Sequence, residues 1–456
     1  MIYKYLLISS LILWWVTASD PHFGTDLSWT PIPKQKQDNV RELPWMSNDS
    51  FKDYLLDKDD RVSNRFPITN YYYPTVNFWF LIYTQFDASH VVIHDKTNLS
   101  MIYKVLDFSS LQAKDLPKNT LYVLQQKISD EKINIIKKNL HYLFENPFSL
   151  EPESKIIYRL LSNAGIKLPL GKLARAAFFN NLKNNIRTQA GQRNFIRDGI
   201  IRSLPYKPFL TKYFSEHNLP PELLAVPFLE SSFNPKAESK VGALGVWQFM
   251  PLISSYYVPK KNLRYDYRSN IGVASVAAAF LMKENFQLMK SWDLAVTAYN
   301  SGTKHLLKTR RELAFKKTKI DLEMIIKSSD SQHFGFASKN FYSEFLALVH
   351  ALAYEEELFN DIHKDDRYNV DDELHFYLLK CSLRLDKHLK RSHLNDILYH
   401  SHHIKDENKA YPRGLIVTSK ENLPLNKFLK LQFHHLLAKK PKDWAALLGN
   451  QSCSTK

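Results

Sequence analysis

The sequence predicts a mainly α-helical protein, with a small β-containing region near its beginning and a small α+β module at its end. From about residue 129 to 360, apolar residues such as Ile133 and Ile136 recur at helical spacing. Residues 76–108 are instead rich in β-branched and aromatic side chains, which favour strands. After residue 360, a helical pattern mixes with short apolar runs such as 415–417.

The β-containing region is expected to hold strands joined by a tight turn. Its β-forming residues lie in three runs, at 76–83, 91–93 and 100–103. The segment 94–98 between the second and third runs contains Asp, Lys, Thr and Asn, which is typical of a hairpin turn.

These patterns divide the chain of 456 residues, which has the length of two or three domains, into five parts. In order, we expect a signal peptide (1–19), a loop-rich and β-containing region (20–128), a helical lead-in (129–194), a main helical domain (195–360) and an α+β module (361–456).

The first residues predict export. A basic start at Lys4 precedes an apolar run at 5–16, and small residues at 17–19 offer a cleavage site. The run is short for a membrane span, although an uncleaved anchor is the alternative. We therefore expect a periplasmic or secreted protein that contacts a membrane only if the signal stays uncleaved.

An excess of basic residues gives the chain a formal net charge of +16, from 62 Lys and Arg against 46 Asp and Glu. Such a charge favours anionic partners: nucleic acid, membrane surfaces or acidic cell-wall polymers. Most of these side chains are scattered and expected on the solvated surface. No nucleic-acid-binding motif accompanies the charge, so we expect no nucleic-acid partner.

The cysteines and histidines indicate no metal centre and no cofactor. Cys381 and Cys453 could pair in an exported protein, but Cys453 lies in a polar tail that would fray, so the sequence leaves the disulfide open. The patch of His400, His402 and His403 is interpreted as surface rather than as a metal ligand set.

The clearest chemical signal lies in residues 218–251. Two prolines followed by Glu222 suit the first turn of a helix. Residues 223–229 are almost wholly apolar, so this helix must be buried, and Pro227 is expected to kink it.

Glu230 is the last residue of this predicted helix before a break at 231–235. Burial and the negative end of the helix dipole both favour a protonated carboxyl group. A protonated carboxyl is what a general acid needs near neutral pH. An isolated glutamate at a helix end would usually reach solvent, so the residues that follow decide between the two interpretations.

Three blocks, in this order, resemble the family 1 lytic transglycosylases. The first is Glu230–Ser231, with Ser239 nine residues after the glutamate. The second is 242–251, GALGVWQFMP, and the third is 298–302, AYNSG. Several spaced blocks are a far stronger signal than one motif. The resemblance covers residues 195 to about 355, roughly a third of the chain.

This resemblance implies a lysozyme-like helical catalytic domain in the part at 195–360. Trp247 before Gln248, together with Leu219–Leu223, is most similar to branch D of the family. Members of that branch often end in LysM repeats, which this sequence lacks, and the β-containing region has no counterpart that we can name.

The resemblance also implies a reaction on peptidoglycan glycan strands. Glu230 would protonate the glycosidic oxygen between N-acetylmuramic acid and N-acetylglucosamine. It would then take the proton of the muramyl 6-hydroxyl, which closes on the anomeric carbon and leaves a 1,6-anhydro end. Ser239 and Gln248 match positions that contact the muramyl sugar. Tyr299 matches a residue that orients the carboxylate, and Asn300 supports the loop around it.

Two alternatives stay open. Ordinary glycosidases use two carboxylates, and the acids nearest to Glu230 in sequence, Glu222 and Glu238, lie outside the positions that the family uses for catalysis. A muramidase that hydrolyses the same bond shares the fold, and a non-catalytic peptidoglycan-binding protein is the second alternative. The sequence does not predict the oligomeric state.

Overall fold

The computed structural model describes residues 40–43, 49–112, 117–147, 152–260, 265–314, 320–329, 334–362 and 373–453. These residues form two compact units. The sheet unit comprises the described residues up to 61 together with 67–195, and the site unit comprises 62–66 and the residues from 196 onward. The predicted signal peptide lies outside the described residues. Across the described part of the chain, no helix combines the length and apolar character needed to cross a membrane.

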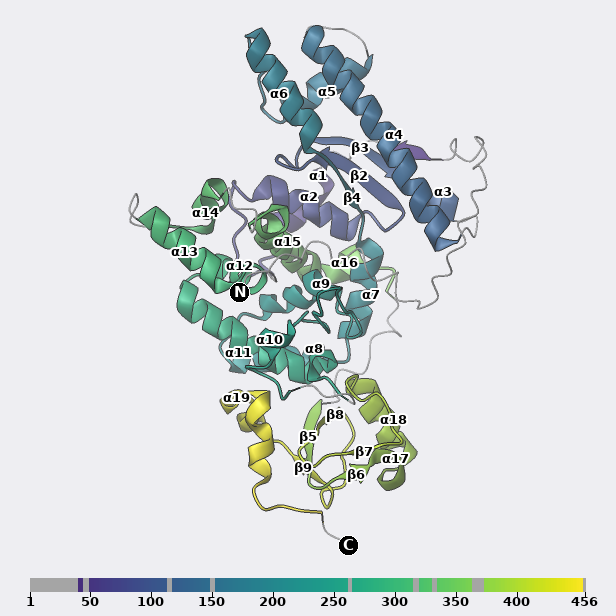
Figure 1. The fold of residues 1–456 in the computed structure, drawn as a ribbon, viewed down its shortest axis with the longest axis vertical. Coiled ribbons are helices and arrows are strands. Elements are labelled where there is room, and N and C mark those ends of the chain that lie inside the picture. Colours follow the sequence, from purple (N-terminus) through teal and green to yellow (C-terminus); the bar gives the residue numbers. More distant parts are fainter. Residues whose placement is uncertain are drawn as a thin grey trace. The chain divides into compact units, whose positions relative to one another are not determined.

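The predicted fold class is confirmed, because helices dominate and the sheets are small and antiparallel (Figure 1). In the sheet unit the elements are β1 (Arg41–Leu43), α1 (Asp49–Leu55), α2 (Tyr73–Thr84), β2 (His90–Asp95), β3 (Ile102–Asp107), α3 (Ser109–Gln112), α4 (Lys118–Glu145), α5 (Pro152–Asn163), α6 (Lys172–Asn185) and β4 (Ile186–Ala190).

The prediction of a strand at residues 76–83 is wrong. The run 76–83 lies inside helix α2, whose residues 78–84 are all buried. A short run that is apolar on every side has no amphipathic period, so periodicity cannot distinguish a buried strand from a buried helix. Pro74 lies in the first turn of α2, where its missing N–H costs nothing. Tertiary burial has here overridden the β-propensity of the side chains.

The predicted hairpin is confirmed. β2 pairs antiparallel with β3, and the sheet order is β1-β3-β2-β4. The turn is closed by Asp95, whose carboxylate accepts hydrogen bonds from the backbone N–H of Thr97 at 2.7 Å and of Asn98 at 2.9 Å. Local bonds of this kind explain why Asp favours turns. β4, which follows α6, is the second partner of β2.

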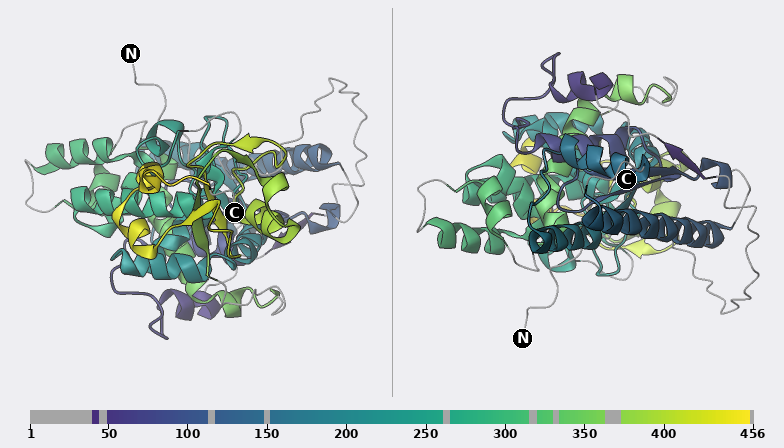
Figure 2. Two further views of the ribbon diagram at one scale, coloured as in Figure 1. Left: turned by 90° about the horizontal axis from the view of Figure 1, so that it is seen from below. Right: turned by 90° about the horizontal axis from the view of Figure 1, so that it is seen from above.

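Both faces of this sheet are covered by helices. Val91 and Ile93 point to one face, where they share a hydrophobic core with residues of α4, α5 and α6. His94 points to the other face, where its ring lies 4.7 Å from that of Phe78 on α2. In the right view of Figure 2 the purple helices α1 and α2 lie on the opposite side of the unit from the blue helices α4 to α6.

The site unit contains the remaining elements. They are α7 (Arg193–Ser203), which begins at the junction, α8 (Lys207–Glu216), η3 (Pro221–Ala225), α9 (Val226–Ser231), α10 (Pro251–Ser254), η4 (Tyr267–Ser269), α11 (Ile271–Met289), α12 (Trp292–Ser301), α13 (Thr303–Ala314), α14 (Leu322–Ser328), α15 (Phe336–Ala353), α16 (Glu355–Leu358), β5 (His375–Leu379), β6 (Leu383–Arg384), α17 (Leu385–His388), α18 (Arg391–His400), β7 (Ala410–Tyr411), β8 (Ile416–Ser419), β9 (Phe428–Lys430), α19 (Phe433–Ala438) and η6 (Pro441–Leu448).

The last part of the site unit is an α+β module. Its sheet has the order β8-β5-β9, and a second antiparallel pair is formed by β6 and β7. Cys381 and Cys453 form a disulfide, which resolves the question that the sequence left open. Gly272 on α11 lets Phe376 of β5 approach closely, since a Cβ there would lie 2.8 Å from the ring.

The interpretation of the histidine patch as surface is wrong. His400 and His403 are buried where the module packs on the helices. The His403 ring lies 2.9 Å from the carbonyl oxygen of Ile416 through Nε2 and 3.2 Å from the Asn270 amide through Nδ1. Burial lowers the pKa of His403 to about 3, so this imidazole is neutral at physiological pH. These histidines satisfy polar groups in the core.

Candidate active site

The segment before Glu230 forms two short helices. We expected one helix kinked at Pro227, and this is wrong in detail: the 3₁₀ helix η3 ends at Ala225 and α9 starts at Val226. Pro227 occupies the second position of α9, where no intrahelical bond from its nitrogen is needed. Every residue of α9 is buried, as the apolar pattern predicted.

Glu230 lies in the last turn of α9 and is only 7% exposed. Burial, and second the charge of Glu344, raise the pKa of its carboxyl group to about 8. Desolvation disfavours the charged form, and a neighbouring acid disfavours it further. The group is therefore mostly protonated at neutral pH, as expected from its position at the end of a buried helix.

Glu344 is the acid that sequence reasoning missed. It lies on α15, is buried, and comes 114 residues after Glu230. No local pattern marks it, because its meeting with Glu230 depends on the packing of α15 against α9. Of the two acids that are near in sequence, Glu222 accepts a hydrogen bond from the backbone N–H of Ser63 at 3.0 Å.

The chain leaves α9 through two residues in the left-handed region. Ser232 has φ 50° and Phe233 has φ 57°, values that side chains with a Cβ seldom adopt. Arg202 stabilises this exit by donating to the carbonyl oxygen of Ser232 at 2.7 Å and to that of Phe233 at 3.3 Å. Gly199 gives the exit room, since a Cβ there would lie 2.6 Å from the Ser232 oxygen.

Ser231 joins the end of α9 to the second block. Its hydroxyl oxygen lies 3.1 Å from the carbonyl oxygen of Pro227 and 2.9 Å from that of Val246, and its one hydrogen is shared between these two acceptors. The same oxygen accepts the N–H of Asn234 at 3.1 Å. The serine beside Glu230 thus holds two loops against the helix that carries the acid.

The loop 242–249 is built around a buried arginine. Arg268 forms an ion pair with Asp266 at 2.8 Å and donates to the carbonyl oxygens of Gly242 at 2.6 Å and Phe249 at 2.8 Å. Gly245 has φ +81°, and a Cβ there would lie 1.9 Å from the Arg268 carbonyl oxygen. Only glycine fits at this position. Sequence reasoning explained the glycine but did not find the arginine.

Ser239 and Gln248 are brought to the same loop. The Ser239 hydroxyl oxygen accepts the N–H of Ala243 at 2.9 Å, so its hydrogen can still be donated. The amide nitrogen of Gln248 donates to the carbonyl oxygens of Ala237 and Gly245, both at 2.9 Å. Its Oε1 is buried with no partner among the described residues. Gln248 therefore closes the loop, and its remaining polar atom is an acceptor.

Tyr299 lies at the end of α12 and close to Glu230. Its hydroxyl donates to the carbonyl oxygen of Trp247 at 2.6 Å rather than to the carboxyl group. Burial, and second the charge of Glu230, raise the pKa of Tyr299 well above its usual value. Asn300 follows it and accepts a hydrogen bond from the Ser338 hydroxyl of α15 at 3.1 Å. The third block thus ties the loop to the helix that carries Glu344.

The arrangement can supply one proton from a buried group and take it back. The loop of the second block offers a hydroxyl donor at Ser239 and an acceptor at Gln248, both of which suit a polar sugar. Among the described residues, no three His, Cys, Asp or Glu side chains are grouped so that they could hold a metal ion.

Comparisons with known proteins match part of the chain. Residues 210–322, which contain all five predicted site residues, match the model of the transglycosylase SLT domain. A stretch of 118 residues is 35% identical to the membrane-bound lytic murein transglycosylase D of Escherichia coli (strain K12), and equally to that of Escherichia coli O6:H1 (strain CFT073). The stretch is 25% of this chain and 26% of each relative, so the chain spans about a quarter of their length. The resemblance inferred from the three blocks is confirmed: the chain carries a transglycosylase SLT domain over residues 210–322 and is similar in part to membrane-bound lytic murein transglycosylase D.

Proposed function

We propose that this protein is a lytic transglycosylase that cleaves peptidoglycan glycan strands outside the cytoplasm. The observation that carries the proposal is the protonated, buried carboxyl group of Glu230, whose pKa is raised to about 8, inside a transglycosylase SLT domain. A carboxyl group with a pKa near the working pH both donates and retrieves a proton efficiently.

In the proposed reaction Glu230 first donates its proton to the glycosidic oxygen, and the bond to the anomeric carbon of the muramyl sugar breaks. The carboxylate then accepts the proton of the muramyl 6-hydroxyl, whose oxygen bonds to the anomeric carbon. A 1,6-anhydro end forms without water, and Glu230 is protonated again. Ser239 would donate to the sugar, and Gln248 would accept from it.

Tyr299 and Asn300 have positioning roles in this proposal. The bond from the Tyr299 hydroxyl to the Trp247 carbonyl holds the backbone next to Gln248. Asn300 fixes the end of α12 to α15. Displacements of such supporting groups cost catalysis, because a misplacement of the reacting atoms by about 1 Å can lower the rate about a hundredfold.

One observation favours a second candidate, hydrolysis of the same bond. Glu344 is a buried carboxyl group close enough to raise the pKa of Glu230. Retaining and inverting glycosidases both work with a pair of carboxyl groups. The comparison with lytic transglycosylases makes the intramolecular reaction the first choice, and Glu344 makes hydrolysis the alternative to be tested.

Digestion of purified sacculi in water enriched in oxygen-18 separates the two candidates. We expect products one water lighter than hydrolysis products, with no heavy oxygen at the reducing end. Products that carry one heavy oxygen would instead establish a muramidase. Glu230→Gln is the matched control and should release neither product. Sacculus binding by the wild type without any release would indicate a non-catalytic binding protein.

A further inference from the structure

The sheet unit contains a segment whose charge is entirely positive. Residues 154–185, which run from the first turn of α5 to the end of α6, include six Lys and Arg and no Asp or Glu. Three of the six, Lys167, Lys172 and Arg175, lie in or beside the connection between the two helices. We call residues 166–175 the α5–α6 tip.

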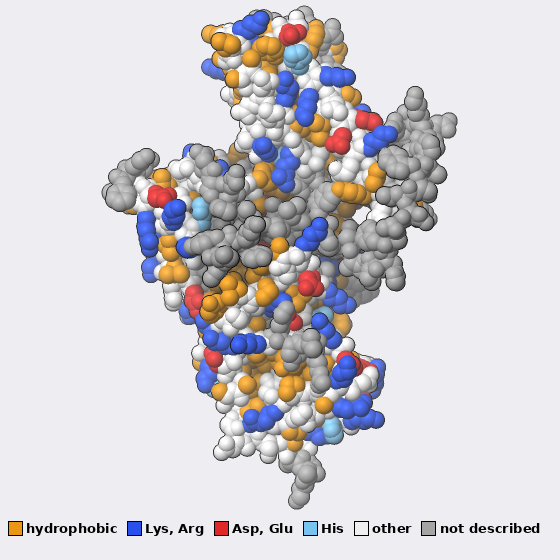
Figure 3. Space-filling view, in the orientation of Figure 1, with side chains coloured by type: hydrophobic (Ala, Val, Ile, Leu, Met, Phe, Trp, Pro, Cys, Tyr) orange, Lys and Arg blue, Asp and Glu red, His pale blue; other side chains and the backbone are white. Residues whose placement is uncertain are grey.

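The tip exposes apolar side chains among these cations. Leu170 is 95% exposed and Leu173 is 89% exposed, and Tyr158 of α5, which lines the same pocket as Leu170, is 50% exposed. Figure 3 shows hydrophobic and basic side chains interspersed over the end of the unit formed by α4, α5 and α6. Single exposed apolar residues are ordinary, but a cluster of them indicates an interaction surface.

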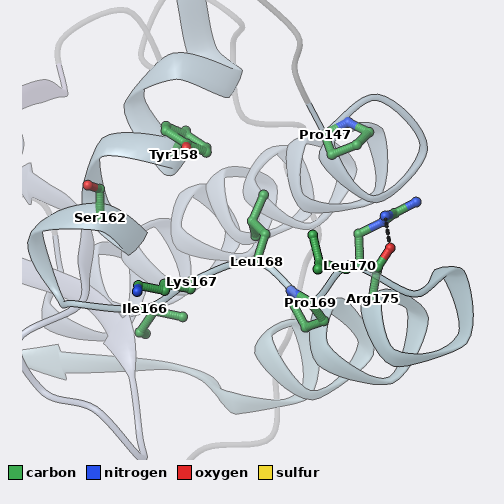
Figure 4. A pocket seen from close by; sticks show the side chains of 9 residues that line it. All are labelled: Pro147, Tyr158, Ser162, Ile166, Lys167, Leu168, Pro169, Leu170 and Arg175. Atoms are coloured by element: carbon green, nitrogen blue, oxygen red, sulfur yellow. Dashed lines mark hydrogen bonds between the residues drawn. The ribbon is translucent and has the colours of Figure 1, made fainter.

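Leu170 projects from a loop that is held in place, and Leu173 projects from the first turn of α6. The Arg175 guanidinium donates to the carbonyl oxygen of Leu170 at 2.7 Å, and Pro169 restricts the backbone before it (Figure 4). Beside this loop lies a pocket of about 270 Å³, lined among others by Tyr158, Leu168 and Arg175. Leu170 is therefore exposed on a loop that a hydrogen bond holds in place, and a pocket lies next to this loop.

Charge and apolarity together point to one kind of partner. A polyanionic glycan would be bound by the cations and would leave the leucines in water. An apolar groove of a protein would bind the leucines and leave the cations without partners. The interface of an anionic bilayer accepts both, because its phosphates attract Lys and Arg while its acyl boundary takes up apolar side chains.

We propose that the α5–α6 tip docks the protein on an anionic membrane surface. Lys167, Lys172 and Arg175 bind lipid phosphates, and Leu170 and Leu173 enter the boundary between headgroups and acyl chains. The pocket next to Arg175 has room for part of a headgroup. This contact lies in the sheet unit, whereas Glu230 belongs to the site unit, and it does not depend on the proposed catalytic function.

A local probe tests the insertion. The full chain carrying Leu173→Cys is labelled with a polarity-sensitive fluorophore, which is selective because Cys381 and Cys453 are paired. Vesicles of phosphatidylcholine with phosphatidylglycerol should shift its emission to the blue, whereas vesicles of phosphatidylcholine alone should not. Leu425→Cys, at a leucine 62% exposed in the C-terminal module, is the matched control and should show no shift. An unshifted probe at position 173, or equal shifts with both vesicles, would overturn the proposal.

Binding measurements test the two components separately. Leu170→Ser with Leu173→Ser should weaken binding to the anionic vesicles at least about tenfold, because two apolar side chains no longer leave water. Lys167→Gln and Lys172→Gln should each weaken it about fivefold. Leu425→Ser should change nothing. If only the lysine changes matter, the tip binds polyanions through charge alone and the proposed membrane docking is rejected; the same holds if soluble dextran sulfate competes fully at physiological salt.

Discussion

Helices α2 and α9 are both short, apolar and started by a proline in the first turn, and both are buried, yet they end differently. α2 ends at Thr84, whose hydroxyl donates back to the carbonyl oxygen of Phe80 at 2.7 Å. α9 places Glu230 in its last turn, and burial there raises the pKa of the carboxyl group to about 8.

The difference shows that burial affects a hydroxyl group and a carboxyl group in different ways. The Thr84 hydroxyl satisfies itself within its own helix, so its burial costs little. A carboxylate at Glu230 would be charged in an apolar place, so the group keeps its proton instead. An acid held in this way keeps its proton at neutral pH, so the proton is available for donation, and ionisation of the group destabilises the fold.

The largest expected effect is on catalysis. Glu230→Gln keeps the shape of the side chain but has no proton to donate and retrieve, so release of products from sacculi should fall at least about a thousandfold. Thr84→Val is the matched change at the end of α2 and should leave activity intact. Comparable release by Glu230→Gln and wild type would remove Glu230 from the mechanism.

The same substitution should stabilise the protein at alkaline pH. Because folding raises the pKa of Glu230, the folded state keeps a proton that the unfolded state loses, so stability falls as pH rises from about 4.5 to about 8. Glu230→Gln abolishes this loss and should gain roughly 2–5 kcal/mol relative to wild type above pH 8. Urea unfolding at pH 5 and pH 9 measures it. Equal pH dependence in both proteins would mean that the carboxyl group is not held protonated.

Tyr299→Phe should lower kcat about tenfold with little change in KM. The variant removes the bond to the Trp247 carbonyl and leaves that buried acceptor unpaired, which costs roughly 1–3 kcal/mol. Steady-state kinetics on a soluble glycan strand and a melting curve give both readouts. A normal rate in a destabilised variant would show that the hydroxyl serves packing alone.

Glu344→Gln should move the pH–rate profile. The charge of Glu344 raises the pKa of Glu230, so its removal lowers that pKa. Activity requires protonated Glu230, hence the alkaline limb should shift to lower pH. An unmoved limb with greatly reduced activity would instead favour a direct role for Glu344, as in the hydrolytic alternative.

The smallest effect is expected at the other helix. Thr84→Val loses one hydrogen bond in a nearly isosteric change, so the free energy of unfolding should fall by about 1 kcal/mol. Thermal unfolding measures it, with the Glu230→Gln protein as the contrast. A larger loss would mean that Thr84 contributes more to stability than this one hydrogen bond.

The sequence predicted the structure best where residues close in sequence determine it. The hairpin followed from turn-forming residues at 94–98 that lie between two runs of β-forming residues. The buried helix and its terminal acid followed from an uninterrupted apolar run that ends at Glu230. The same kind of run misled at 76–83, because that strand was predicted from β-branched and aromatic residues, and burial on all sides overrode their propensity.

By itself, then, the sequence determined the mainly helical class, the three blocks and the acid that they frame. Only the tertiary structure decided that Glu344 lies near Glu230, that Arg268 builds the loop of the second block, and that His403 is buried and neutral. The physical reason is distance along the chain. Contacts within one helix or turn depend on residues that are close in sequence, so a short pattern can predict them. The contact between α9 and α15 depends on how whole helices pack, so no short pattern predicts it.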